Sequence, residues 1–481
     1  MNRIALWLFL GALMVRLGVL VAWPFDGLYG QDAFAYYRQA TALAQGTLPL
    51  DFFWPNGYPL VAALFMPALG QTPFAAQLVS LLSGASLAPL AYLLTCELLP
   101  HTHRRAGILA GLIVMTAGQL VLSSIVVMAD MLALFWAALA AWLLVRAWRN
   151  GRPAGWLVGA GAALAFAAIT RWLYVLLAPA FGLYLVYQMR RQPYPWWLIA
   201  LPVISGLAVL LPQIAISLNR PEGLLHSWLL GWNPANAFRR QFDNVDGHFD
   251  YALPIGLFYA EPAAHPAYLF PLLGLAALWG GWRLWGDKAW GPLILLGGWG
   301  GGVYLFLAGI PYQNFRFGMT LYLPLVVLAA SGLNAVWENA STRRVAQAAA
   351  VVSLAGMLVW AYSTNGEFVI AQNRGKAIVA QVEQSVPPDA TLITFGLTLT
   401  ARQYTRLNVV ELFDQDSASL DALTRSESAI YLLLDPGNVE SQWRGRKPDV
   451  LYQWLKQHAA VIPIDSFATY ELFQVRRTSV P

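Results

Sequence analysis

The chain has 481 residues, of which 58% are hydrophobic and only 11% are charged, and its formal net charge at pH 7 is +5. Soluble domains carry about a quarter charged residues, so a chain this apolar cannot bury its hydrophobic side chains in one soluble core. Composition therefore excludes an ordinary soluble protein and predicts an integral membrane protein. The single cysteine, Cys96, excludes any intrachain disulfide.

Long uncharged runs divide the chain up to Gly366. A run of about 18 or more apolar residues is long enough to cross the hydrocarbon core as a helix. The candidate spans are Ile4–Pro24, Pro73–Cys96, Ala106–Ala129, Met131–Val145, Pro153–Thr170, Trp172–Met189, Gln192–Asn219, Pro266–Trp282, Ala289–Phe315, Phe317–Trp337 and Val345–Gly366. Gly57–Gly70 is shorter and contains two prolines, so we expect it to be interfacial or re-entrant. The sequence predicts an α-helical polytopic membrane protein with about eleven transmembrane helices.

Basic residues predict the orientation of these spans. If Arg3 is cytoplasmic, every short inner loop that follows contains arginine or lysine, as the positive-inside rule requires. We therefore predict a membrane-embedded domain over residues 1–366, with outer loops at 25–71 and 217–265. The tail, residues 367–481, then also lies outside the membrane on the outer face.

The tail has the pattern of a small α/β domain. Short apolar runs alternate with a helical pattern at Val450–His458. Strands are expected at Thr391–Phe395, Asn408–Phe413, Ala429–Leu434, Val461–Pro463 and Ala468–Val475.

Two acidic residues lie next to predicted membrane boundaries on the outer face. Asp32 begins a helical pattern at Ala33–Gln45, where it is equally suited to be an N-cap or a catalytic base. Asp130 starts the fourth span and is either a helix-start residue or a functional group at membrane depth.

Two outer arginines, Arg171 and Arg316, lie where the positive-inside rule gives no reason for a cation. One interpretation is that each extends to lipid headgroups; the other is that both bind a phosphate at the outer leaflet. Arg38 and Arg16 are weaker candidates of the same kind. Arg16, inside the first span, is expected to need a carboxylate or phosphate partner.

Carboxylates and arginines at one membrane face are typical of sugar transfer from an isoprenoid phosphate. A carboxylate takes the proton from an acceptor hydroxyl as its oxygen attacks the anomeric carbon. Cations stabilise the charge of the departing lipid phosphate.

The motifs around these residues resemble a known family. Gln31-Asp32-Ala33 with Tyr36, followed by Trp54-Pro55-Asn56-Gly57-Tyr58-Pro59-Leu60, resembles the first outer loop of the GT-C membrane glycosyltransferases. Thr170-Arg171 and Asn314-Phe315-Arg316-Phe317 resemble two later turns of these enzymes. The similarity is to the bacterial branch akin to protein O-mannosyltransferases and lipid A aminoarabinose transferases.

The resemblance implies a function and a site. It implies inverting transfer of a sugar from a polyprenyl-phosphate donor to a hydroxyl of a lipid, glycan or protein acceptor. It implies a multi-pass protein of the bacterial cytoplasmic (inner) membrane, with the active site and C-terminal domain facing outward and no nucleic-acid partner. Members of the superfamily differ in needing a divalent metal ion, so metal dependence stays open. The implied catalytic residues are Asp32 and Asp130, and the implied substrate-binding residues are Tyr36, Arg38, Tyr58, Arg171 and Arg316.

Two other functions compete with this interpretation. A transporter or flippase for a lipid-linked or polar solute would show internal repeats and charges at the membrane midplane, and the sequence shows neither. An O-antigen-type ligase or polymerase would concentrate arginines in a large later outer loop. Arg239 and Arg240 keep that alternative open.

Overall fold

The computed structural model describes residues 3–50, 52–99, 104–149, 153–219, 231–244, 246–425 and 429–477. Part of the predicted outer loop 217–265, residues 220–230 and 245, therefore lies outside the described residues. The chain forms two compact units, and each is described by itself. The first comprises Met1–Leu28, Ala35–Phe238 and Leu253–Glu367, and the second comprises Tyr29–Phe34, Arg239–Ala252 and Phe368–Pro481.

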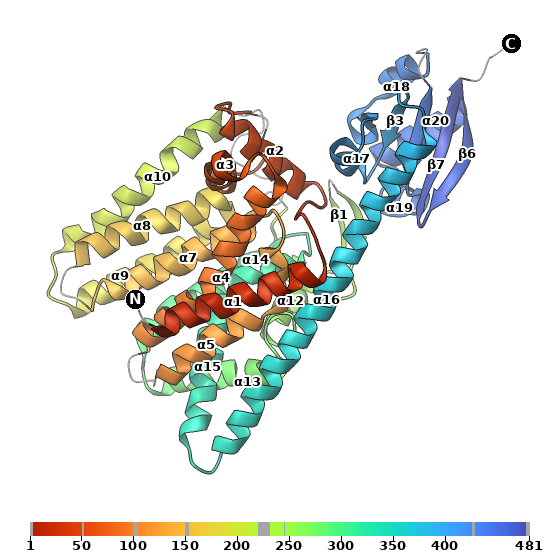
Figure 1. The fold of residues 1–481 in the computed structure, drawn as a ribbon. Helices are drawn as coiled ribbons and strands as arrows, with labels where there is room; N and C mark the ends of the chain where they lie inside the picture. The colour runs from red at the N-terminus through yellow and green to blue at the C-terminus, as the bar shows by residue number, and fades with distance from the viewer. Residues whose placement is uncertain are drawn as a thin grey trace. The chain divides into compact units, whose positions relative to one another are not determined.

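Helices make up nearly all of the regular structure before residue 386 (Figure 1). The α-helices up to the second predicted outer loop are α1 (Arg3–Ala22), α2 (Asp32–Ala44), α3 (Gly57–Leu69), α4 (Pro73–Leu98), α5 (Arg104–Thr116), α6 (Gly118–Ser124), α7 (Ala129–Arg146), α8 (Pro153–Thr170), α9 (Ala178–Arg191) and α10 (Ala200–Leu218). Those that follow are α12 (Ile255–Ala260), α13 (Pro271–Gly286), α14 (Trp290–Gly309), α15 (Tyr322–Glu338) and α16 (Arg343–Ser385). Short 3-10 helices are η1 (Trp172–Leu177), η2 (Trp196–Ile199), η3 (Pro234–Phe238), η4 (Glu261–Ala263) and η5 (Phe315–Leu321).

The number of spans is slightly lower than predicted. Nine described helices are long and apolar enough to cross a membrane, or ten if α5 and α6, bent by 59°, form one broken span. The predicted span that does not reach this length is the eighth, Pro266–Trp282, which forms α13 and has only 16 residues because its helix begins at Pro271. The fold class itself, a polytopic helical membrane protein, is confirmed.

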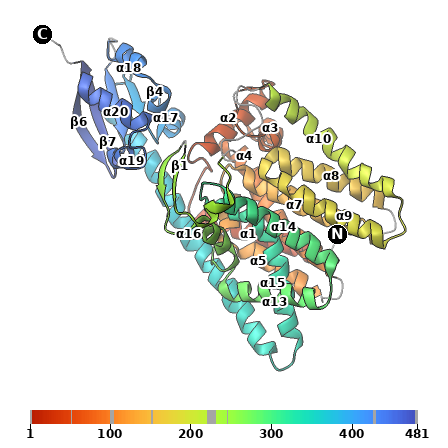
Figure 2. The same cartoon turned by 180° about the vertical axis from the view of Figure 1, so that it is seen from behind.

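Small residues bring the membrane helices close together. A Cβ on Gly332 of α15 would lie 1.9 Å from the Ala276 carbonyl oxygen of α13, and one on Gly280 would lie 2.1 Å from the Leu328 carbonyl oxygen. Glycine is therefore required where α13 crosses α15, and this close approach is typical of membrane helix pairs. Figure 2 shows the two helices packed side by side.

Arg16 of α1 is fully buried, and its partners differ from those expected. Its Nε donates to the Ser124 hydroxyl at 2.9 Å, and its Nη1 donates to the Ala12 carbonyl at 2.9 Å. No carboxylate among the described residues pairs with it. A hydroxyl and a helix carbonyl accept from the guanidinium instead, and Arg16 thereby ties α1 to the end of α6.

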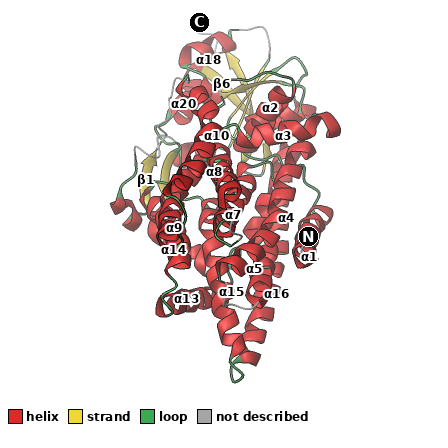
Figure 3. Cartoon of the chain, turned by 90° about the vertical axis from the view of Figure 1, so that its left-hand side faces the viewer, coloured by secondary structure: helices red, strands yellow, loops and turns green. Residues whose placement is uncertain are grey.

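The second unit contains a five-stranded mixed sheet, whose strands are yellow in Figure 3. The strand order is β4-β3-β5-β7-β6. Its strands are β3 (Thr391–Thr394), β4 (Asn408–Glu411), β5 (Ile430–Leu434), β6 (Ala459–Phe467) and β7 (Tyr470–Arg477). The first three are parallel, and β7 pairs antiparallel with β5 and β6. Its further helices are α17 (Thr398–Tyr404), η6 (Leu412–Asp414), α18 (Ser417–Thr424), α19 (Pro436–Ser441) and α20 (Lys447–His458). A separate hairpin pairs β1 (Gln241–Asn244) with β2 (Gly247–Asp250). The predicted strands and α/β character of the tail are confirmed.

Both faces of the five-stranded sheet are covered. Along β5, Ile430, Leu432 and Leu434 pack with α20 on one face, while Tyr431 and Leu433 pack on the other. The second face is covered by the C-terminal turns of α16, through apolar residues at 378–386. Because these turns bury an apolar stripe against the sheet, α16 continues as one 43-residue helix beyond the predicted end of the last span.

Candidate active site

The turn that carries Arg316 is held by several hydrogen bonds. The Asn314 side chain caps η5 by accepting from the Arg316 amide at 3.2 Å. The Tyr259 hydroxyl accepts from the Asn314 amide at 3.1 Å and donates to the Tyr312 carbonyl at 2.9 Å. The turn is therefore fixed before any ligand binds, as a binding site requires.

Phe317 brings together the two arginines that were predicted at the outer face. The guanidinium carbon of Arg171 lies 4.9 Å from the centroid of the Phe317 ring, and that of Arg316 lies 5.9 Å from the same centroid. Phe317 itself is buried. Cation–π contacts of this kind orient a guanidinium without using its hydrogen-bond donors. The structure therefore places both predicted phosphate contacts around one aromatic ring.

Asp130 forms a buried ion pair with Arg171. Arg171 Nη1 contacts Asp130 Oδ1, and the two side chains are only 14% and 5% exposed. The second carboxylate oxygen, Asp130 Oδ2, is buried with no hydrogen-bond partner among the described residues. The pair uses one of the five donors of the guanidinium, so Asp130 orients Arg171 while other donors stay available for a ligand.

Met128, the N-cap residue of α7, fixes the position of Asp130. The Ser80 hydroxyl donates to the Met128 carbonyl at 3.2 Å, and the Met128 sulfur accepts from Arg316 Nη1 at 3.1 Å. Tyr58 is fully buried, and its hydroxyl contacts Ser80 at 3.1 Å. The structure thus places Tyr58 behind the site, where it positions α4 and α7.

The predicted first outer loop is anchored by a buried polar network. Gln39 Nε2 donates to Asn56 Oδ1 at 2.8 Å, and the Asn56 amide donates to Gln213 Oε1 at 2.9 Å. Tyr36 is almost fully buried, with its ring 5.3 Å from that of Tyr58. Arg38 of α2 is exposed. Of the predicted substrate contacts, Tyr36 and Tyr58 therefore form packed structure, and only Arg171 and Arg316 converge.

The loop also packs against the end of α8, next to Arg171. A Cβ on Gly57 would lie 2.6 Å from the Thr170 hydroxyl and 2.7 Å from the Ile169 carbonyl oxygen. We expect Gly57→Ala to cost about 1–3 kcal/mol of stability because the backbone of α8 must move. Gly155→Ala in the same helix is the matched control, since its Cβ would meet no described heavy atom within 4 Å.

Thermal unfolding in detergent measures this difference. Gly57→Ala should lower the midpoint, whereas Gly155→Ala should leave it unchanged or raise it, because alanine restricts the unfolded chain. Equal midpoints for the two variants would show that the contact between the loop and α8 is loose.

Asp32 lies in the second unit, as the first residue of α2. The expectation of a carboxylate at a helix start is confirmed. Asp246 of the β1–β2 hairpin has a raised pKa. Desolvation is the larger cause, and the negative charge of Asp32 is the second cause. The hairpin is held by Gln442, whose Nε2 donates to the Asp246 carbonyl at 2.9 Å. Asp32 therefore has a neighbouring acid that the loop motif did not single out.

The sequence did not reveal the supporting roles of three residues. Phe317 contacts both arginines, Met128 contacts Arg316, and Asp246 neighbours Asp32. The aromatic residues on both sides of Arg316 could have indicated the role of Phe317. The roles of Met128 and Asp246 depend on contacts between segments that are distant in the sequence. Within the described residues, no group of three or more His, Cys, Asp and Glu side chains is arranged to hold a metal ion.

Comparison with known proteins agrees with this architecture. Residues 55–214 match the family model described as dolichyl-phosphate-mannose-protein mannosyltransferase. No curated protein sequence matches the chain. The fold is similar to ArnT from Cupriavidus metallidurans bound to undecaprenyl phosphate, with 15% identity, a TM-score of 0.66, and coverage of 98% of this chain and 97% of ArnT.

A second similar structure is the archaeal oligosaccharyltransferase AglB from Archaeoglobus fulgidus in complex with an inhibitory peptide and a dolichol-phosphate. It is 12% identical, with a TM-score of 0.59, and the match covers 99% of this chain and 75% of AglB. The family match begins at Pro55, so it covers the second part of the loop motif and the Arg171 turn but leaves out Asp32 and Tyr36. The fold likeness covers the bundle and the C-terminal sheet. The chain therefore has the GT-C fold that it shares with ArnT and AglB, and its residues 55–214 match the mannosyltransferase family model.

Proposed function

We propose that the protein transfers a sugar, with inversion, from a polyprenyl-phosphate donor to an acceptor hydroxyl at the outer face of the bacterial cytoplasmic membrane. The observation that carries this proposal is the convergence of Arg171 and Arg316 on Phe317, beside the buried carboxylate of Asp130. Two oriented guanidiniums suit a phosphate group, which accepts charge-assisted hydrogen bonds from such forks.

An apolar cavity next to this site supports a donor with a hydrocarbon chain. Its volume is about 260 Å³, and it lies among α7, α8, α9 and α10. Two of its lining residues, Ala168 and Val175, flank Arg171 in the chain, each within about one helical turn. A donor phosphate on Arg171 would therefore have apolar surface beside it for the polyprenyl tail.

The proposed reaction assigns one role to each charged group. The acceptor oxygen attacks the anomeric carbon from the face opposite the phosphate, and its proton passes to the carboxylate of Asp32. The bond between the anomeric carbon and the phosphate oxygen breaks, and the polyprenyl phosphate leaves with the electron pair. Arg171 and Arg316 stabilise that charge. The role of Asp32 rests on its place at the start of α2 and on the resemblance of Gln31-Asp32-Ala33 to the first outer loop of GT-C glycosyltransferases.

Asp130 receives a positioning role in this proposal. It contacts Arg171 and is buried, so its geometry suits holding the guanidinium better than meeting an acceptor hydroxyl. The acceptor is a lipid, a glycan or a protein. We expect the outer face and the tail domain to determine which of these classes the enzyme uses.

Donor binding tests the arginines directly. Replacing either Arg171 or Arg316 by alanine should weaken binding of a polyprenyl-phosphate sugar by about tenfold to a hundredfold, because each loses a charged hydrogen-bond partner. Lysine should rescue poorly, since it cannot form the two-pronged contact. Arg190→Ala, an exposed arginine in the last turn of α9, is the control.

The assay is titration of the purified protein with the labelled donor, followed by a transfer assay with a panel of acceptors. If alanine at both positions left donor affinity unchanged, the two arginines would be anchors for lipid headgroups only. A transporter or flippase would bind the donor and move it without releasing a glycosylated product, so the transfer assay separates the two functions.

A further inference from the structure

A second cavity, which is lined by charged residues and has a volume of about 570 Å³, lies at the other end of the helices that carry the candidate active site. The segment η1–α9 leads from Arg171 to Arg191, and the segment η5–α15 leads from Arg316 to Asn334; both Arg191 and Asn334 line this cavity. Its volume is in the range of ordinary small-molecule sites. In the orientation proposed above, this end faces the cytoplasm.

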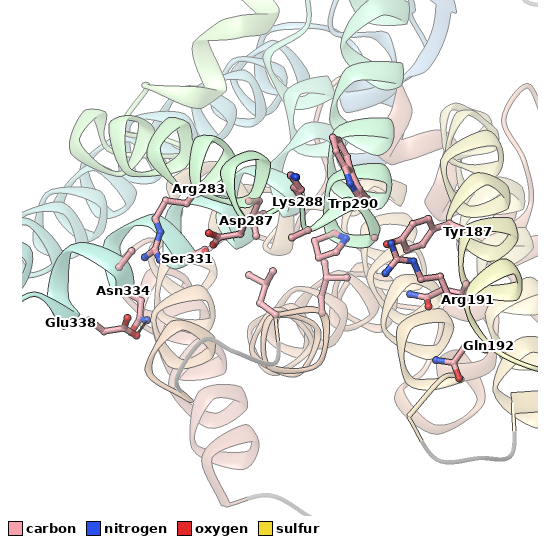
Figure 4. A pocket seen from close by; sticks show the side chains of 18 residues that line it. Tyr187, Arg191, Gln192, Arg283, Asp287, Lys288, Trp290, Ser331, Asn334 and Glu338 are labelled. Atoms are coloured by element: carbon pink, nitrogen blue, oxygen red, sulfur yellow. Dashed lines mark hydrogen bonds between the residues drawn. The ribbon is translucent and has the colours of Figure 1, made fainter.

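The cavity is lined by charges of both signs. Figure 4 shows Arg283 and Asp287 on one side and Arg191 on the other, with Lys288 above. Glu338 completes the charged lining. Three cations and two carboxylates suit a zwitterionic ligand better than a simple anion, because each sign of charge finds a complementary group.

Asn334 supplies an independent sign of a ligand. Its side chain is only 1% exposed, and its Nδ2 donates to Glu338 Oε1 at 2.6 Å. Its Oδ1 is buried and has no hydrogen-bond partner among the described residues. A buried acceptor of this kind calls for a donor, and Asn334 is one of the residues that line the cavity.

Lys288 is held in a backbone conformation that favours glycine. It follows the end of α13 with φ +52°, and the Ala289 amide donates back to the Leu284 carbonyl at 2.9 Å, as in a helix-ending motif. Glycine would adopt this conformation without steric cost. The backbone conformation therefore gives no reason for a lysine at this position. The ammonium group of the lysine adds a cation to the cavity.

The depth of the cavity matches that of lipid headgroups. Trp290 lines it, and Trp282 and Trp285 of α13 are 71% and 63% exposed. Exposed tryptophans of this kind gather at the boundary between hydrocarbon and water. A ligand at this boundary is reached from the membrane, which favours a phospholipid over a soluble phosphate.

We propose that this cavity binds the phosphoethanolamine headgroup of a membrane phospholipid. The phosphate contacts Arg283 and Lys288, and the ammonium group donates to Asn334 Oδ1 beside the carboxylates of Asp287 and Glu338. This inference is separate from the sugar-transfer reaction and concerns a different end of the bundle.

Native mass spectrometry of the delipidated protein tests the proposal, with phosphatidylethanolamine and phosphatidylcholine as probes. The two lipids share the phosphate, but only the ethanolamine headgroup has N–H donors. Phosphatidylethanolamine should bind about tenfold more tightly. Asn334→Leu should remove this preference and leave phosphatidylcholine binding unchanged.

The cations are tested with matched variants. Arg283→Gln and Lys288→Gly should weaken binding of both lipids by about tenfold to a hundredfold, whereas Arg190→Gln should not. Lys288→Gly keeps the backbone conformation, so its loss of binding cannot come from misfolding. Sugar transfer in detergent should stay at the unmodified level in Lys288→Gly, which separates this site from the proposed function.

Two results would overturn the inference. Equal binding of phosphatidylethanolamine by Arg283→Gln, Lys288→Gly and Arg190→Gln would show that the cavity is not the lipid site. If soluble phosphoethanolamine displaced phosphatidylethanolamine at a concentration equal to that of the lipid, the natural ligand of the cavity would be a soluble phosphate and not a phospholipid.

Discussion

Asp32→Asn should lower the rate of sugar transfer by about a hundredfold or more while donor affinity changes little. Asparagine keeps the shape of the side chain but cannot take the proton from the acceptor hydroxyl. Asp32→Glu should retain part of the activity if the longer side chain still reaches the acceptor. The measurement is the initial rate of transfer at saturating donor, with folded yield checked by size exclusion in detergent.

Asp246→Asn is the matched control for this variant. It removes an acid of the same unit whose pKa Asp32 helps to raise, so it changes the local charge by the same amount. We expect a smaller loss of rate in Asp246→Asn than in Asp32→Asn. Full activity of folded Asp32→Asn protein would end the proposal for Asp32 and make Asp246 the next acid to test.

The Asp130–Arg171 pair should dominate the stability of the site. Asp130→Ala leaves a buried guanidinium without its carboxylate, and breaking a buried pair in this way costs about 3–5 kcal/mol. The double variant Asp130→Leu/Arg171→Met removes both charges and should recover most of that loss, because apolar side chains fill the space without a desolvation penalty. Thermal unfolding of the single and double variants in detergent measures the coupling.

The pair between Glu97 and Arg146 provides the comparison. Its oxygen and nitrogen lie 2.5 Å apart, but Arg146 is 34% exposed, so water can replace the partner and Glu97→Gln should cost much less. If Asp130→Ala were no more destabilising than Glu97→Gln, the first pair would be structurally dispensable. Donor binding should be weakened in the stable double variant by about tenfold to a hundredfold, as in Arg171→Ala, because Arg171 is absent from it.

Patterns within one segment allowed most elements to be predicted. The strands of the tail follow from alternating apolar residues, and the helix beginning at Asp32 follows from its spacing. The continuation of α16 was not predicted, because charged residues such as Glu367 and Arg374 indicate the end of a span. The apolar residues Ile378, Val379 and Val382 do lie at helical spacing, but only the sheet that they cover explains why the helix continues.

The site was predicted as a set of residue types and not as an arrangement. Arg171 and Arg316 were identified because their position relative to the membrane is unusual, a property that the sequence contains. Their meeting on Phe317, and the pairing of Arg171 with Asp130, depend on how distant helices pack. Tyr58 is the opposite case. It belongs to a clear sequence motif and was predicted to contact substrate, but it is fully buried and packs inside the structure.

The Asp130–Arg171 pair has a consequence for the biogenesis of the protein. Asp130 leaves the ribosome well before Arg171. If it crosses the hydrocarbon core alone on its way to the membrane boundary, its ionised side chain is disfavoured by about 2.5–3.5 kcal/mol at the centre of the core. Inserted together, α7 and α8 bring the carboxylate and the guanidinium into the bilayer as a neutralised couple. The translocon would therefore release these two helices as one hairpin, and a ribosome stalled between them would hold α7 at the channel until its partner arrived.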